Sequence, residues 1–148
     1  MKKLFGLFLV CLTLISITAC SGGAKKPEEA FLDELSHCIT EEYKTNKLDF
    51  KNMQSTSQYE YKKLSKYVFD ENGNRRYEEW SDISFFVLAE MYLGILEKEP
   101  SYIGYLDKMQ YLGFFVKIYG LEFDKKYCDE IKKHIQVYYD AHDLLSSY

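Results

Sequence analysis

The sequence contains little that marks an enzyme or a metalloprotein. It has no GxSxG nucleophile elbow, no glycine-rich phosphate loop, no dinucleotide fingerprint and no HExxH or CxxC spacing. The three histidines, His37, His134 and His142, do not follow a metal-ligand pattern. We therefore predict that the protein is not an enzyme and that it has no catalytic residue, no bound metal and no cofactor.

Proline and net positive charge are scarce as well. Only two prolines occur among 148 residues, so little in the chain interrupts helices. The 19 basic residues are outnumbered by 23 acidic ones, which predicts no basic face for nucleic acid. A hydrophobic content of 47% with 17% aromatic residues is typical of a folded domain and not of a disordered chain.

The first 20 residues have the layout of an export signal. Lys2 and Lys3 form a short positive region, and an uncharged apolar run follows at positions 4–19. This run is shorter than the roughly 20 apolar residues that a permanent membrane span needs. An ordinary secretory signal cleaved near Ala19 is the alternative, but Ile17 is too large for the small residue expected three positions before the cut.

The run ends in Ile17-Thr18-Ala19-Cys20, which resembles the lipobox of bacterial lipoproteins. The resemblance covers residues 1–20 only, and the family prefers leucine where this chain has Ile17. It implies that the Cys20 thiol receives a diacylglyceryl group, that a peptidase cuts before Cys20, and that the new amino terminus is often acylated too.

Lipidation sets the expected domain boundaries and location. Residues 1–19 are then a signal peptide, residues 20–27 a lipidated tether, and residues 28–148 a single domain. Each buried methylene contributes about 0.8 kcal/mol, so two or three acyl chains anchor a protein stably. Membrane lipid is therefore a predicted partner through acylated Cys20, and the domain is expected to face outside the cytoplasm at a cell membrane or an outer membrane.

Beyond the tether, apolar residues recur at helical spacing in almost every segment. The pattern predicts an all-α bundle of four or five helices, over residues 27–46, 58–69, 81–98, 101–120 and 121–147, with Arg75 as the alternative start of the third. Residues 47–58 show no period and are predicted to be a connector. The segment at 58–69 also suits a strand, so a short β-hairpin near 67–77, turning at Asn72-Gly73, is the local alternative.

Glycines in the most apolar part of the chain predict a close contact between two helices and the end of one of them. The short connection around Pro100 predicts an antiparallel helical hairpin, in which Gly94 and Gly104 face each other and permit close approach. Gly120 is the expected C-terminal cap of the second helix in this hairpin.

Two cysteines remain once Cys11 is removed and Cys20 is lipidated. Cys38 and Cys128 lie on the apolar stripes of the first and last predicted helices, and export permits disulfides. A bond across this 90-residue separation would stabilise the fold by about 4–5 kcal/mol in the chain-entropy model. Two separate buried thiols are the alternative.

Two functional hypotheses follow. The first is a non-enzymatic protein-interaction module with an envelope protein partner, of the assembly-chaperone, pilotin-like, or immunity and exclusion type. The second is a small-ligand-binding or hydrolytic surface lipoprotein with an interhelical cleft lined by tyrosines and carboxylates. A deep pocket in which several titratable groups converge would favour the second hypothesis.

Overall fold

The computed structural model describes residues 23–48, 50–98 and 102–146. Five α-helices form the described part of the chain: α2 (Pro27–Asn46), α3 (Met53–Val68), α4 (Ile83–Glu97), α5 (Tyr102–Tyr119) and α6 (Cys128–Ser146). Two single 3₁₀ turns, Phe50–Asn52 and Tyr77–Glu79, precede α3 and α4. No strand occurs within the described ranges, and the prediction of a small all-α bundle is confirmed.

Helix α2 has the bounds that the sequence pattern predicts. Pro27 stands at its first turn together with Glu28 and Glu29, which suits the positive end of the helix dipole. The helix ends where Lys47 adopts a left-handed conformation and its backbone N–H donates to the carbonyl of Tyr43. The buried face of α2 carries Phe31, Leu35 and Ile39.

The predicted connector at 47–58 is wrong over its second half. Helix α3 already begins at Met53, so residues 53–58 are helical. Apart from Met53 these residues are polar and lack hydrophobic spacing, but they contain no proline or glycine that would end a helix. One of these residues, Ser57, is buried inside the bundle. The first residues of α3 are therefore helical without a hydrophobic period that reveals them.

The β-hairpin alternative at 67–77 reduces to one isolated bridge between Phe69 and Arg75. The turn between them is organised by the carboxylate of Asp70, which accepts hydrogen bonds from the backbone N–H groups of Asn72 and Asn74, each at 2.8 Å. Gly73 has φ +79°, a conformation that other residues rarely adopt. The preferred prediction of a helix ending near residue 69 is confirmed.

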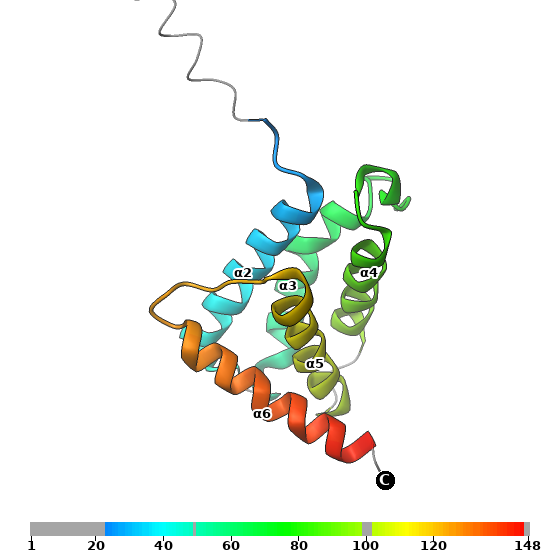
Figure 1. The fold of residues 1–148 in the computed structure, drawn as a ribbon. Coiled ribbons are helices and arrows are strands. Elements are labelled where there is room, and N and C mark those ends of the chain that lie inside the picture. The colour runs from blue at the N-terminus through cyan, green and yellow to red at the C-terminus, as the bar shows by residue number, and fades with distance from the viewer. Residues whose placement is uncertain (1–22, 49, 99–101, 147–148) are drawn as a thin grey trace, which may run out of the picture.

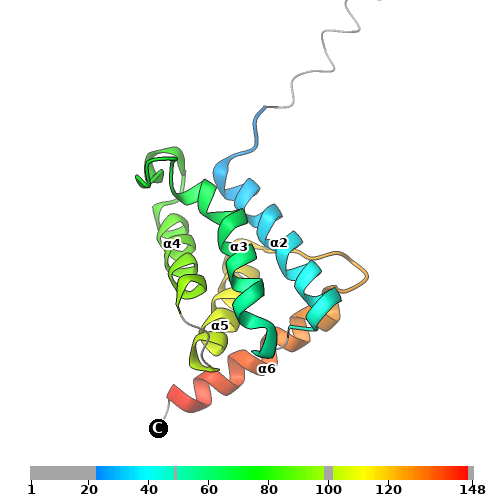
Figure 2. The ribbon, with the colours of Figure 1, turned by 180° about the vertical axis from the view of Figure 1, so that it is seen from behind.

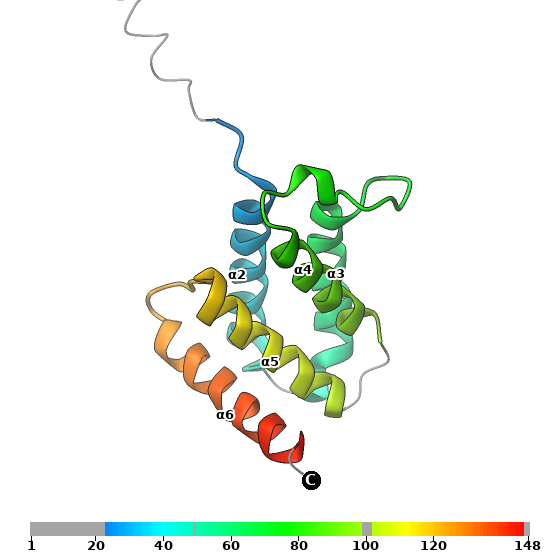
Figure 3. The ribbon, with the colours of Figure 1, turned by 45° about the vertical axis from the view of Figure 1, so that its right-hand side comes forward.

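Helices α4 and α5 run antiparallel and lie side by side (Figure 1, Figure 3). The carboxylate of Asp82 caps α4 by accepting from the N–H groups of Ser84 and Phe85. Gly120 follows α5 with φ +68°, which confirms it as the cap. The expectation for Gly94 is wrong, because a Cβ atom placed there would meet no heavy atom within 4 Å.

The close approach occurs instead where α5 packs on α6. A Cβ atom at Gly113 would lie 3.2 Å from Cδ2 of Tyr139. Helix α6 begins at Cys128 and not at Leu121, and Leu121 and Phe123 are buried from the non-helical segment that precedes it. Asp124 then accepts from the N–H of Lys126 and ends that segment.

The core is aromatic and lies where α2, α4 and α5 meet. The ring of Phe31 packs against Trp80 at 5.8 Å, Phe85 at 6.3 Å and Phe115 at 5.8 Å between centroids. The indole N–H of Trp80 donates to the carbonyl of Tyr67 at 3.1 Å, so its polar atom is satisfied.

Residues 23–26 leave the bundle at one end, and α6 ends at the other (Figure 1, Figure 2). Among the helices of the described ranges, none has both the length and the apolarity needed to cross a bilayer.

Candidate functional site

A lysine lies completely inside the bundle. Lys108, on α5, has an exposed fraction of 0%. Its Nζ donates to Glu42 Oε2 at 2.7 Å and to Glu60 Oε2 at 2.5 Å. Glu42 comes from α2 and Glu60 from α3, and both carboxylates are buried. Because buried charges are costly unless they are paired and hydrogen-bonded, the position of Lys108 depends on both carboxylates.

Tyr92 of α4 completes this cluster. Its hydroxyl donates to Glu60 Oε1 at 3.0 Å, so both oxygens of Glu60 are engaged. The four residues Glu42, Glu60, Tyr92 and Lys108, which we call the buried cluster, come from four different helices. The buried cluster therefore connects α2, α3, α4 and α5 through polar contacts in the interior of the bundle.

The buried cluster holds two carboxylates and one ammonium. Burial raises the pKa of Glu60 to about 7, although the charge of Lys108 opposes this shift. Burial alone would lower the pKa of Lys108, but the charges of Glu42 and Glu60 outweigh it and raise that pKa above its ordinary value. Burial, and then the charge of Glu60, raises the pKa of Tyr92 well above its ordinary value. Lys108 is thus held charged and Tyr92 neutral.

A half-open cavity of about 240 Å³ adjoins this cluster between α2 and α3. Its lining residues are Cys38, Glu41, Glu42, Thr45, Thr56, Tyr59 and Glu60. Glu42 is one of the lining residues, and its Oε1 is buried without a hydrogen-bond partner among the described residues. The cavity is smaller than the roughly 300–1,000 Å³ of drug-sized ligand sites. Titratable groups therefore converge at a pocket, but only a small molecule would fit.

The two predicted disulfide partners are free thiols in this structure. Cys38 is buried on the face of α2 that carries Glu42 and looks toward α3. Cys128 is half-buried at the start of α6, the helix that Tyr43 contacts through a hydrogen bond to Glu130. Because an α-helix turns by 100° per residue, Cys38 and Tyr43 lie on opposite faces of α2, and Cys38 points away from the helix that carries Cys128. The structure thus holds the alternative arrangement, two separate thiols.

Cys38, which lines the cavity, does not have the lowered pKa of a nucleophilic cysteine. Burial, followed by the charge of Glu60, raises the pKa of Cys38 to about 12, so the thiol stays protonated at neutral pH. Lipid attachment is predicted at Cys20, which lies outside the described residues.

The histidines do not come together. Nε2 of His134 lies 3.1 Å from the carbonyl oxygen of Leu48, and its ring packs on Tyr138 with centroids 5.0 Å apart. His37 is exposed on α2, and the side chain of His142 lies outside the described side chains. Within the described ranges 23–48, 50–98 and 102–146, no three metal-ligating side chains form a group.

A second feature is a row of exposed apolar side chains on the outer face of α4. Ile83, Val87 and Met91 follow one another at four-residue intervals, and Met91 is 51% exposed. On α5, Ile118 is 66% exposed, and the hydroxyl of Tyr111 contacts the sulfur of Met91 at 3.8 Å. We call Ile83, Val87, Met91, Tyr111 and Ile118 the apolar strip.

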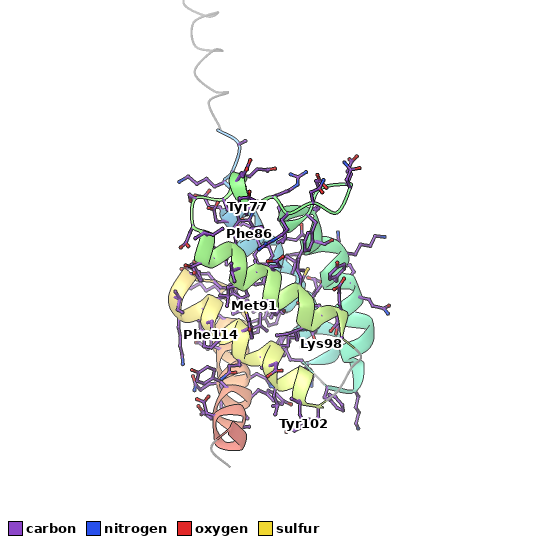
Figure 4. All side chains as sticks on the ribbon, turned by 90° about the vertical axis from the view of Figure 1, so that its right-hand side faces the viewer. Tyr77, Phe86, Met91, Lys98, Tyr102 and Phe114 are labelled. Atoms are coloured by element: carbon purple, nitrogen blue, oxygen red, sulfur yellow. The ribbon has the colours of Figure 1, made fainter. Side chains whose placement is uncertain are left out.

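Figure 4 looks onto the side of the molecule where the apolar strip lies. Met91 on α4 and Phe114 on α5 both appear on this side. Phe114 is half-buried and packs edge-on against Tyr139 of α6, with centroids 6.1 Å apart. Apolar surface therefore continues from α4 across α5 toward α6, which is more than the single apolar residues that scatter over ordinary surfaces.

Sequence patterns did not single out the buried cluster. Glu42, Glu60 and Lys108 are separated along the chain by 18 and 48 residues and match no motif. One usable indication was the position of Lys108 within an apolar helix, between Tyr105 and Leu112 on the same face. A charge at such a position predicts a buried partner, but not which carboxylate provides it.

Comparison of the chain with protein-family models, with curated proteins and with solved structures finds no significant match.

Proposed function

We propose that the protein is a lipid-anchored lipoprotein of the bacterial cell envelope that acts as a non-enzymatic protein-interaction module. The assembly-chaperone, pilotin-like, and immunity and exclusion types are all of this class. Residues 1–20 support the anchor through Lys2, Lys3, the apolar run and the lipobox-like ending at Cys20. The short segment between Cys20 and α2 keeps the helical domain close to the lipid surface.

The observation that carries the interaction role is the apolar strip. Ile83, Val87 and Met91 form a ridge that runs obliquely along α4 over about 12 Å, at a rise of 1.5 Å per residue. A ridge of this kind can pack into a groove of an amphipathic helix, which presents its own side chains every three or four residues. We assign the strip to such a helix in an envelope protein.

The surroundings of the strip fit a protein interface. Arg75 and Glu90 form an ion pair of 2.6 Å, and Glu90 lies on α4 beside the row. Interfaces commonly combine an apolar centre with a polar rim, in which the charges select the partner and orient it. Full burial of each large apolar side chain would contribute about 1.5–3 kcal/mol before the cost of association is subtracted.

The anchor is tested by replacing each signal-region cysteine in turn. In cells that make the full-length chain, Cys20→Ser is expected to abolish acylation and to move the protein out of the membrane fraction. Cys11→Ser is the matched control and is expected to leave acylation and location unchanged. Incorporation of labelled fatty acid into the Cys20→Ser chain would refute the anchor.

The interaction role is tested by photo-crosslinking in cells. A photoreactive amino acid at Met91 is expected to give one reproducible adduct with an envelope protein. The same amino acid at Lys62, which is exposed on α3, is the control and is expected to give none. An absence of adducts at Met91, or the same adducts from both positions, would contradict the proposed role of the strip.

A further inference from the structure

Met91 is the most exposed of the sulfur-containing residues whose side chains the structure describes. It is half exposed on the outer face of α4, whereas Met109 and Cys38 are buried and Cys128 is half-buried. Figure 4 shows Met91 on the side of the molecule where the apolar strip lies. Oxidation of a thioether requires contact between the sulfur and a dissolved oxidant. Met91 is therefore open to this reaction, and Met109 is shielded from it.

The hydroxyl of Tyr111 is positioned to stabilise an oxidised Met91. It donates from α5 to the sulfur of Met91 on α4, at 3.8 Å. Burial raises the pKa of Tyr111, so this hydroxyl keeps the proton that it donates. A thioether sulfur is only a weak acceptor, whereas oxidation to the sulfoxide makes the side chain polar and adds an oxygen that accepts well. The same donor therefore binds the oxidised side chain better than the reduced one.

We propose that Met91 is an oxidation site for hydrogen peroxide, and that its conversion to the sulfoxide weakens binding of the partner helix to the apolar strip. The second half of this proposal rests on the proposed function of the strip. In the reaction, a lone pair of the Met91 sulfur attacks one oxygen of the peroxide, and the S–O bond forms as the O–O bond breaks. The proton on the transferred oxygen passes to the departing hydroxide, so water leaves. The sulfur is oxidised, and the peroxide is reduced to water.

Oxidation at this position changes the apolar strip and leaves the core intact. Met91 ends the ridge that begins at Ile83, and it is the residue through which the ridge contacts Tyr111 of α5. The sulfoxide turns a flexible apolar side chain into a polar one, which disrupts apolar interfaces. A partner helix that covers the strip then has to bury this polar group, which costs free energy. Met109 lies in the core, so its oxidation would act on the fold and not on the strip.

The modification is tested on the purified full-length protein in a peroxide-free, non-ionic detergent. The protein is treated with hydrogen peroxide, and peptide mass spectrometry follows the gain of oxygen at each methionine. Met91 is expected to be oxidised at least about tenfold faster than Met109, which becomes accessible only when the core opens. Equal rates at Met91 and Met109, or no oxidation of Met91, would overturn the proposal.

The effect on the strip is tested by photo-crosslinking in cells, with the photoreactive amino acid at Val87, one turn before Met91. Hydrogen peroxide given before irradiation is expected to lower the yield of the envelope-protein adduct at least about tenfold. In a Met91→Leu chain, leucine keeps the apolar volume and cannot form a sulfoxide, so the adduct is expected to survive the same treatment. Equal loss of the adduct from both chains, or its retention when Met91 is oxidised, would refute the proposal.

A permanently polar variant and the untreated sample separate this proposal from the proposed function. Met91→Gln places a polar amide at the position of the sulfoxide and is expected to lower the adduct yield without any peroxide. An adduct as strong as that of Met91→Leu would contradict the effect of a polar group on the strip. If the untreated native chain gives no adduct at Val87, the proposed interaction role fails, and the oxidation rates of Met91 and Met109 still test the modification site.

Discussion

Removal of the ammonium from the buried cluster is expected to cost a large part of the stability of the fold. In Lys108→Met, a side chain of similar length remains, but Glu42 and Glu60 lose their common partner. Both contacts are short, at 2.7 Å and 2.5 Å, and Glu60 is only 1% exposed. Breaking a buried ion pair from one side costs about 3–5 kcal/mol. A domain of this size has about 5–15 kcal/mol in total.

The measurement is urea unfolding at pH 7, followed by circular dichroism at 222 nm. Lys132→Met, which removes an exposed lysine from α6, is the control and is expected to change the free energy of unfolding by less than about 0.5 kcal/mol. A triple variant with Lys108→Met, Glu42→Met and Glu60→Gln is expected to recover most of the loss, because no charge stays buried. A Lys108→Met protein within about 1 kcal/mol of the native one would refute the role of Lys108 as the buried counter-ion.

Three further predictions follow from single sites. Burial raises the pKa of Glu60 from its ordinary 4.5 to about 7, so the native state holds this proton more tightly than the unfolded state. The contribution of this group to native stability is therefore expected to fall as the pH rises from about 4.5 to about 7. In the Glu60→Gln variant, the urea midpoint of unfolding is expected to depend less steeply on pH over this range. Gly94→Ala, with open space around the added carbon, is expected to stabilise by about 0.5–1 kcal/mol, whereas Gly120→Ala, at φ +68°, should destabilise in the same assay. Asp82→Ala should cost about 1 kcal/mol through loss of the α4 cap, and Asp82→Asn, which can still accept both bonds, should cost much less; equal losses would contradict the capping role.

Helix boundaries were predictable wherever a local stop signal coincided with hydrophobic spacing. Pro27 and the polar end at Asn46 bound α2 correctly, and Gly120 ends α5 as expected. The start of α3 was missed, because residues 53–58 have no apolar spacing from which a helix can be predicted. The start of α6 was missed because Leu121 and Phe123 fit a helical stripe, yet they are buried from a non-helical segment.

The sequence by itself determined the helical class of the domain and the excess of acidic residues, because each of these depends on neighbouring residues or on composition. Only the tertiary structure decided which charges meet. Glu42, Glu60 and Lys108 come together because α2, α3 and α5 pack around one point, and no local spacing encodes that contact. The same packing left Cys38 and Cys128 on different sides of α2, and it left one oxygen of Glu42 facing no donor.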